Sequence, residues 1–205
     1  MLRKSELDVL RLRREIKHRI PREIERNRVW GLDLTGKTDL SGRQRMILGL
    51  IDHGSRACLR LNELCDKSSW ATLRELIGAF RQFGLPRLIR TDNEACFTSR
   101  LMRFSMRLLG IRLQPSVPHC PWQNGRIERL FGTLKRGLDR IAVRDGAELA
   151  LRLAEFRRFY NHVRPHQHLG GRTPAEAWDG RHKATGVPRY FTAWGGLLSG
   201  GYFPP

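Results

Sequence analysis

The sequence lacks any apolar run of about eighteen residues, the length that a membrane-spanning helix requires. Its N-terminus is too charged to contain the apolar segment of a signal peptide. We therefore expect a cytoplasmic protein that does not contact a membrane. Internal repeats and low-complexity segments are also absent, and 205 residues suffice for one main domain with a small appendage.

Cysteine is scarce and shows no metal-binding pattern. The four cysteines, Cys58, Cys65, Cys96 and Cys120, include no Cys-x-x-Cys pair. That spacing argues against a disulfide framework and against a structural zinc site. We expect four reduced thiols.

Acidic residues are few compared with basic ones. Lys and Arg total 38 against 20 Asp and Glu, which gives a formal net charge of +18 and a pI of about 11.2. A chain of this charge favours an acidic polymer as its partner, most simply a nucleic acid. Other basic soluble proteins share this composition, so the charge does not identify the chemistry.

The pattern along the chain predicts three strands, a helix, a strand, a helix, a strand and then two helices. Residues 1–28 form a basic arm interrupted by Pro21. Apolar runs predict strands at 29–35, 46–51 and 57–61, and shorter strands at 87–90 and 111–113. This order fits an α/β fold with a mixed sheet whose first three strands are antiparallel.

The helices are predicted from their periodicity and their capping residues. The first begins after Asp66 or Ser68 and ends at Gly84, and the second begins after Thr98 or Ser99 and ends at Gly110. Their expected core positions are Trp70, Leu73, Leu76, Ile77 and Phe80, and then Leu101, Phe104, Met106 and Leu108. A Pro-rich loop at 114–121 precedes two long amphipathic helices, whose expected core positions are Ile127, Leu130, Phe131, Leu134, Leu138 and Ile141, and then Leu149, Leu153, Phe156 and Tyr160. Thr173 and Pro174 predict one more helix start, before a Gly- and aromatic-rich tail.

Three acids occupy positions where a carboxylate is costly. Asp33 lies inside an apolar strand, Asp92 directly follows another strand, and Glu128 lies beside the apolar stripe of a helix. A buried carboxylate needs a partner or a cation. Each acid alone has an ordinary explanation, as a turn former, a solvated helix residue or half of an ion pair. Asp52, next to His53 and Gly54, is best explained as a turn former.

The three acids together resemble the DDE triad of retroviral integrases and bacterial insertion-sequence transposases. There are 58 residues between Asp33 and Asp92 and 35 between Asp92 and Glu128. The surrounding segments are also similar: Trp30-Gly-Leu-Asp-Leu-Thr35, Arg90-Thr-Asp-Asn93, and Pro121-Trp-Gln-Asn-Gly-Arg-Ile-Glu-Arg-Leu-Phe-Gly-Thr-Leu-Lys135. A closing signature matches at Tyr160-Asn-His-Val-Arg-Pro-His-Gln-His-Leu-Gly170 and Thr173-Pro-Ala-Glu-Ala-Trp178. One departure is that the family usually continues the second acid as Asp-Asn-Gly-x-Glu-Phe, whereas Asp92 is followed by Asn93-Glu-Ala-Cys-Phe97.

The resemblance implies a ribonuclease H-like fold with a mixed five-stranded sheet flanked by helices. It also implies a basic N-terminal arm at 1–28, a catalytic core at 29–165 and a C-terminal extension at 166–205. Asp33, Asp92 and Glu128 would be both the catalytic residues and the ligands of two Mg²⁺ (or Mn²⁺) ions, with Asp33 bridging them. The implied activity is DNA cleavage followed by strand transfer, as in DNA integration and transposition.

Six residues near Glu128 are expected to contact DNA. Lys135 lies nearly two helical turns after Glu128, on the same face. The others are Arg126, Arg129, Arg136, Gln123 and Asn124. For the arginines, a solvated basic face is an alternative explanation.

Two other functions use the same residues: a ribonuclease H-like nuclease that only hydrolyses nucleic acid, and an inactive DNA-binding remnant of a mobile element. The expected partners are mobile-element ends, target DNA and further copies of the chain, in a bacterial, nucleoid-associated protein. The 28 residues before the core cannot form the helix-turn-helix region that transposases of this kind place there. Either a separate end-binding polypeptide supplies it, or the chain is a truncated copy.

Overall fold

The computed structural model describes residues 24–116, 124–181 and 186–204. Its main element in these ranges is a five-stranded mixed sheet in the order β3-β2-β1-β4-β5. The strands are β1 (Val29–Thr38), β2 (Gln44–Asp52), β3 (Cys58–Leu64), β4 (Leu88–Thr91) and β5 (Arg112–Pro115). β1 pairs antiparallel with β2 and parallel with β4, so the first three strands form a meander and the last two arrive through helices. The predicted mixed sheet is confirmed.

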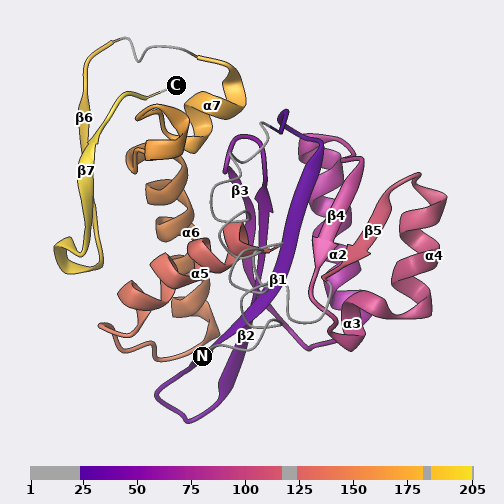
Figure 1. Ribbon diagram of the computed structural model, residues 1–205. Helices are drawn as coiled ribbons and strands as arrows, with labels where there is room; N and C mark the ends of the chain where they lie inside the picture. The colour runs from indigo at the N-terminus through magenta and orange to yellow at the C-terminus, as the bar shows by residue number, and fades with distance from the viewer. Residues whose placement is uncertain (1–23, 117–123, 182–185, 205) are drawn as a thin grey trace, which may run out of the picture.

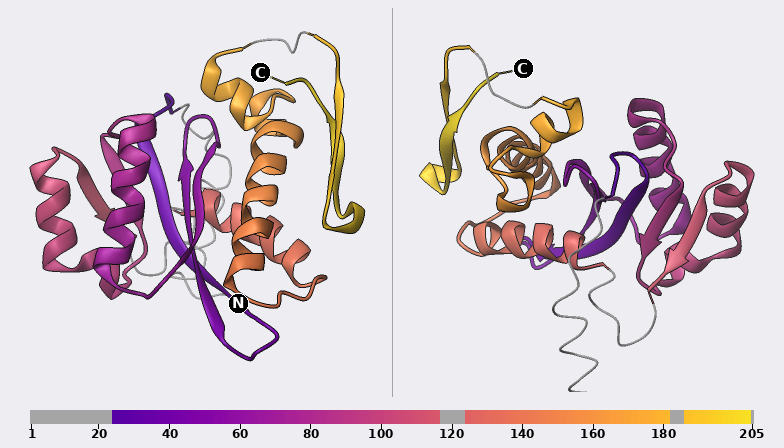
Figure 2. Two further views of the ribbon diagram at one scale, coloured as in Figure 1. Left: turned by 180° about the vertical axis from the view of Figure 1, so that it is seen from behind. Right: turned by 45° about the horizontal axis from the view of Figure 1, so that its top comes forward.

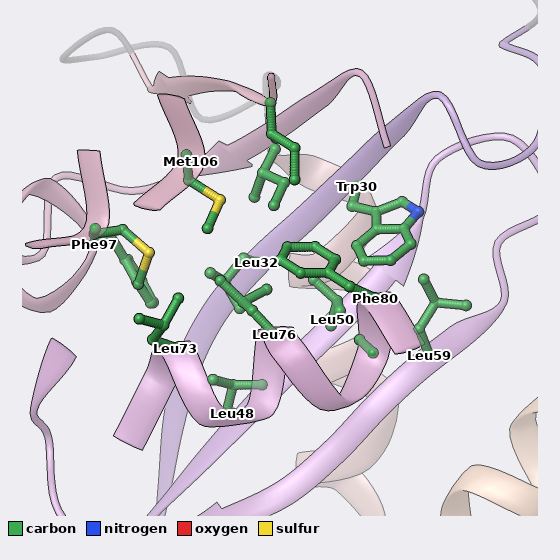
Figure 3. Close-up of a cluster of buried hydrophobic side chains, with 14 of the residues drawn as sticks. Trp30, Leu32, Leu48, Leu50, Leu59, Leu73, Leu76, Phe80, Phe97 and Met106 are labelled. Carbon is green, nitrogen blue, oxygen red and sulfur yellow. The ribbon is translucent and has the colours of Figure 1, made fainter. Parts of the chain in front are cut away.

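Successive side chains of each strand point to opposite faces of the sheet, and both faces carry apolar side chains. Trp30, Leu32, Leu48 and Leu50 are completely buried on the face that α2 (Ser69–Phe83), α3 (Ala95–Thr98) and α4 (Arg100–Leu108) cover (Figures 1 and 3). The opposite face carries Ile47, Ile51 and Leu61 beneath α5 (Gly125–Leu138) and α6 (Gly146–Arg158). The two helical layers therefore enclose the sheet, as Figure 2 shows from two further directions.

The caps of the first two long helices agree with the prediction. Ser68 caps α2 by accepting a hydrogen bond from the Ala71 amide, and α2 ends at Gly84, whose φ is 81°. Ser99 caps α4 in the same way, through the Met102 amide. Gly110, with φ of 70°, follows the end of α4. After these helices, β4 lies beside β1 and β5 lies beside β4.

Four of the expected core positions on these helices are wrong. Trp70 is 66% exposed and Ile77 39%, while Phe104 is 67% and Leu108 75% exposed. In α2 the sheet is covered partly by small residues, Ala71, Thr72 and Ala79, that an assignment by side-chain size overlooks. In α4 the buried pair is Met102 and Met106, spaced by four residues, and Phe104 between them points away.

The next two helices form the second layer. α5 ends at Leu138, earlier than the predicted stripe, and Ile141 packs against the cluster from the following turn. Asp145 caps α6 through the Glu148 amide, and a π-helical turn, η2 (Phe159–Val163), continues it. The Asn161 side chain accepts a hydrogen bond from the Cys58 amide (2.8 Å) and donates one to the Cys58 carbonyl (2.9 Å). These two hydrogen bonds connect η2 to the edge strand β3.

The C-terminal part contains one predicted helix and one hairpin that was not predicted. A 3-10 turn, η3 (Gln167–Leu169), precedes α7 (Pro174–Asp179), which begins with a capping box between Thr173 and Glu176. β6 (Arg189–Ala193), a short turn η4 (Trp194–Gly196) and β7 (Leu198–Tyr202) then form the hairpin beyond α6 (Figure 1). Trp194 and Leu198 are buried in the cluster of α5 and α6, which explains why a Gly-rich tail is ordered there. No helix in the described ranges is both long and apolar enough to cross a membrane.

Candidate active site

Asp33 lies in the middle of β1, on the face that α5 covers. It pairs across the sheet with Gly49 of β2, and directly opposite residues of an antiparallel pair point to the same face. A Cβ atom on Gly49 would lie 2.6 Å from Cε1 and Cζ of Phe131 and 3.2 Å from Cδ1 of Ile127. The missing side chain at Gly49 therefore lets α5 approach the sheet beside Asp33.

Asp92 reaches the same edge of the site through the parallel pairing of β1 and β4. The register joins Gly31 to Arg90, and continuing it by two residues brings Asp92 level with Asp33. Asp92 is half-buried, and its Oδ1 accepts a hydrogen bond from the Glu94 amide (3.1 Å). This turn holds the carboxyl group at the end of β4.

Glu128 lies in the first turn of α5 and is exposed. Ile127, Leu130 and Phe131 bury the opposite side of this turn against the sheet. Just before it, the Asn124 side chain is 5% exposed and donates a long hydrogen bond (3.5 Å) to the Leu32 carbonyl, next to Asp33. The start of α5 is thus fixed to β1 one residue away from the first acid.

The three predicted acids interact electrostatically. Burial raises the pKa of Asp33 to about 7, against the lowering effect of the Leu34 amide, which donates to Oδ1 (2.8 Å), and the negative charges of Asp92, Glu128 and Glu94 raise this pKa further. Burial also raises the pKa of Asp92, and Glu94 adds to this effect. The fold thus brings together residues that are 59 and 36 positions apart in the sequence.

As the side chains stand, no group of three or more His, Cys, Asp or Glu residues in the described ranges is close enough to hold a metal ion. The donors nevertheless fit a hard divalent cation. They are all carboxylate oxygens, and the most buried of them keeps an abnormally high pKa that a bound cation would reverse.

The departure after Asp92 introduces a fourth carboxylate near the site. Glu94 forms an ion pair with Lys67 (2.5 Å) at the start of α2. The Lys67 charge lowers the pKa of Asp92 and so partly offsets the crowding of negative charge. The sequence alone left the role of Glu94 open, and this pairing gives it a structural partner.

The residues predicted to contact DNA have different environments. Lys135, Arg129 and Arg136 are exposed on α5. Arg126 is half-buried and donates to the His53 carbonyl, while buried Asn124 fixes the start of α5 instead of facing solvent. Gln123 and the Cys120 thiol lie outside the described residues. Asp52 is a turn residue, as expected: it is completely buried and accepts hydrogen bonds from Asn27 and Ser55.

Two features next to the acids escaped sequence reasoning. His53 is 2% exposed, and neither ring nitrogen has a hydrogen-bond partner among the described residues. A Cβ atom on Gly31 would lie 2.7 Å from its Nε2 and 3.1 Å from Oδ1 of Asn124. Gly31 and Gly49 are thus two strand positions at which a side chain would collide with the groups packed on this face. Their only sequence signal is a glycine inside a strand, which marks a close approach.

Part of the chain is similar to known proteins. The family described as "Integrase core domain" matches residues 109–174, which include Glu128 and the closing signature. The chain is 36% identical over 87 residues to the putative transposase InsD for insertion element IS2E of Escherichia coli (strain K12), covering 42% of this chain and 40% of the transposase. It is 29% identical over 122 residues to the Gag-Pro-Pol polyprotein of squirrel monkey retrovirus, covering 60% of this chain and 6% of the polyprotein. The chain therefore spans less than half the length of these relatives.

Solved structures confirm the predicted fold. The integrase catalytic core domain of HTLV-2, described in complex with magnesium in a trimeric form, superposes with a TM-score of 0.62 at 18% identity and covers 76% of this chain and 99% of that one. The catalytic core domain of BIV integrase gives a TM-score of 0.58 at 20% identity over 75% of this chain and 95% of that one. At these identities the likeness establishes the ribonuclease H-like fold of integrase cores.

Proposed function

We propose that this chain is a member of the integrase core family, to which part of it is similar, and that it cleaves and joins DNA strands. The observation that carries the proposal is the environment of Asp33. Partial burial raises the pKa of this half-buried acid, and the charges of three further carboxylates raise it more. Negative charge gathered around a buried acid is costly for stability and is explained by a site that works with a bound cation.

In this proposal Asp33, Asp92 and Glu128 hold two Mg²⁺ or Mn²⁺ ions, which would activate the attacking oxygen and stabilise the leaving one. Asp33, whose pKa responds to both of the other acids, would hold both ions. Asp92 is held by the turn at Glu94, and Glu128 is carried on the rigid first turn of α5. Water would attack at an element end, and the released 3′-hydroxyl would then attack target DNA.

The DNA partner and the assembly are also proposals. The net charge of +18 supports binding to mobile-element ends and to target DNA, with Lys135, Arg129 and Arg136 among the contacts. Joining two ends to one target requires more than one active site, which supports a homo-oligomer on DNA. Recognition of the ends by a separate helix-turn-helix polypeptide is a further hypothesis. We also propose that the protein associates with the nucleoid. The division of the chain into an arm, a core and an extension, with boundaries after residues 28 and 165, is a hypothesis as well.

The test uses a branched DNA that mimics the product of strand transfer, incubated with Mg²⁺ and either the chain or its Glu128→Gln variant. Resolution of the branch with rejoining by the chain, and loss of both in the variant, is the expected result. Because the substitution removes no positive charge, DNA affinity should stay the same. Hydrolysis without rejoining would favour a nuclease, and tight binding without reaction would favour an inactive remnant. Equal rates for both chains would exclude Glu128 from the site.

A further inference from the structure

Four arginines from three separate segments meet beside the catalytic acids. Arg56 lies in the turn between β2 and β3, Arg126 and Arg129 lie on α5, and Arg164 follows η2. The guanidinium groups of Arg56 and Arg126 both donate to one acceptor, the His53 carbonyl. We call these four residues the arginine corner.

The positive charge of the arginine corner is only partly compensated by negative charge. No carboxylate in the described ranges forms an ion pair with any of its four members. The Asp52 carboxylate affects Arg56 and Arg126 electrostatically, but its oxygens are already occupied by Asn27 and Ser55. Arg164 is stacked over the Tyr160 ring at 5.8 Å, a contact that orients the cation without neutralising it.

Several basic groups in this region have lowered pKa values. Burial lowers the pKa of Arg56, and the charge of Arg129 lowers it further. Burial likewise lowers the pKa of His53 to about 3 and that of His166 to about 4, and neighbouring arginines strengthen both effects. Both imidazoles are therefore neutral at pH 7. Repelling cations held together by the fold are stabilised by an anion that bridges them.

The geometry points to the arginine corner as a binding surface for the phosphate backbone of the DNA duplex that flanks the cleavage point. This inference rests on the proposed function for the identity of the polymer, and it adds Arg56 and Arg164 to the DNA contacts. His53 touches the position of Gly31, two residues before Asp33. Arg126 and Arg129 lie two residues before and one residue after Glu128 on α5, so the corner adjoins the proposed site. A duplex bound at the site would therefore present phosphates to the corner within a few base pairs of the scissile bond.

The corner also explains an unusual backbone conformation. Arg56 has a φ of 64°, in the left-handed region that residues other than glycine rarely adopt. Its Nη1 donates to the His53 carbonyl (3.0 Å), so the turn directs the guanidinium toward α5 instead of into solvent. A conformation of this kind is kept where the surrounding structure requires it.

The experiment measures the affinity of the full chain for a duplex of arbitrary sequence at several salt concentrations, without divalent metal. Removing one phosphate-binding cation should reduce the slope of log K against log salt by about 0.9. For Arg56→Gln with Arg164→Gln we expect a slope smaller by roughly 1.8 and an affinity reduced about tenfold or more at about 0.1 M salt. The matched control is Arg74→Gln with Arg107→Gln, which removes the same charge from exposed positions on α2 and α4, across the sheet from α5.

Two further measurements keep the result interpretable. Arg56→Lys with Arg164→Lys keeps both charges and should retain the wild-type salt slope, and circular dichroism should show that all variants are folded. The same slope for the Gln pair as for its control would overturn the inference. Because no metal or reaction is involved, that failure is distinct from a failure of the branched-DNA test, which concerns the acids.

Discussion

Gly49→Ala should weaken the site without touching a catalytic residue. The added Cβ would lie 2.6 Å from two ring carbons of Phe131, whereas carbon atoms in contact are normally about 3.5–4.0 Å apart. Strand β2, which contains Gly49, is hydrogen-bonded to β1 on one side and to β3 on the other, so its backbone cannot easily move. The strain must therefore be relieved by moving Phe131, and with it α5, by about 1 Å. Overpacking of this kind typically costs about 1–3 kcal/mol of stability.

The consequence for catalysis follows from the position of Glu128. It lies on the same turn of α5 as Ile127 and Phe131, so a retreat of the helix moves Glu128 away from Asp33. A misplacement of about 1 Å in a reacting group can reduce the rate by about a hundredfold. We therefore expect branch resolution by Gly49→Ala to fall about tenfold to a hundredfold, together with a lower urea midpoint.

The chain offers a control and a rescue for this prediction. Gly132→Ala adds the same methyl group on α5, where nothing lies within 4 Å. It should leave the rate unchanged and stabilise the helix by up to about 1 kcal/mol. Adding Phe131→Leu to Gly49→Ala removes the clashing ring atoms and should restore part of the stability. A Gly49→Ala variant as stable and as active as the parent would refute the proposed contact between α5 and the sheet.

Three further predictions concern charge and hydrogen bonding. Burial raises the folded-state pKa of Asp33 to about 7 from 3.8, so its contribution to stability is complete below about pH 4 and is lost as the pH rises through 7. Asp33→Asn should therefore raise the melting temperature of the metal-free chain at about pH 8 and not at about pH 3. A rise of equal size at both pH values would contradict this prediction. Mg²⁺ should stabilise the parent at the higher pH and not this variant, which calorimetry can measure. Lys135→Ala should weaken DNA binding and reduce the salt slope by about 0.9, and an unchanged slope would remove Lys135 from the interface. Asn161→Asp can still accept from the Cys58 amide but cannot donate to its carbonyl, so thermal unfolding should show a loss of about 1–3 kcal/mol; an unaltered midpoint would show that η2 does not depend on this pair.

Much of the fold could be predicted because local signals and long-range pairing agree. Strand alternation around Trp30 and Leu32 and the caps at Ser68 and Ser99 act over a few residues and are visible in the sequence. The errors arose where packing between elements decides the outcome. The burial of Ala71 and the exposure of Trp70 depend on how α2 is rotated against the sheet, which periodicity alone does not determine. The β6–β7 hairpin depends on a contact between Trp194 and α6, which is distant in the sequence.

In the candidate site, too, some features could be predicted from the local sequence and others depend on packing between elements. The spacing of Asp33, Asp92 and Glu128 was sufficient to propose them, because their sequence context is specific. Their coupling to Glu94 became apparent only once β4 and α5 were placed beside β1. The arginine corner could not be predicted either, since Arg56 and Arg164 are separated by more than a hundred residues and meet only in the folded chain. Neutral His53 carries no sequence signal at all.

The most direct test of the central claim is anomalous X-ray diffraction from crystals of the chain soaked in Mn²⁺. We expect an anomalous peak between the carboxylates of Asp33 and Asp92, and a second peak beside Glu128 when DNA is bound. Asp33→Asn crystals should lose the first peak. Manganese bound elsewhere, with the Asp33 carboxylate still turned only toward the Leu34 amide, would contradict the assignment of these three acids as the metal site.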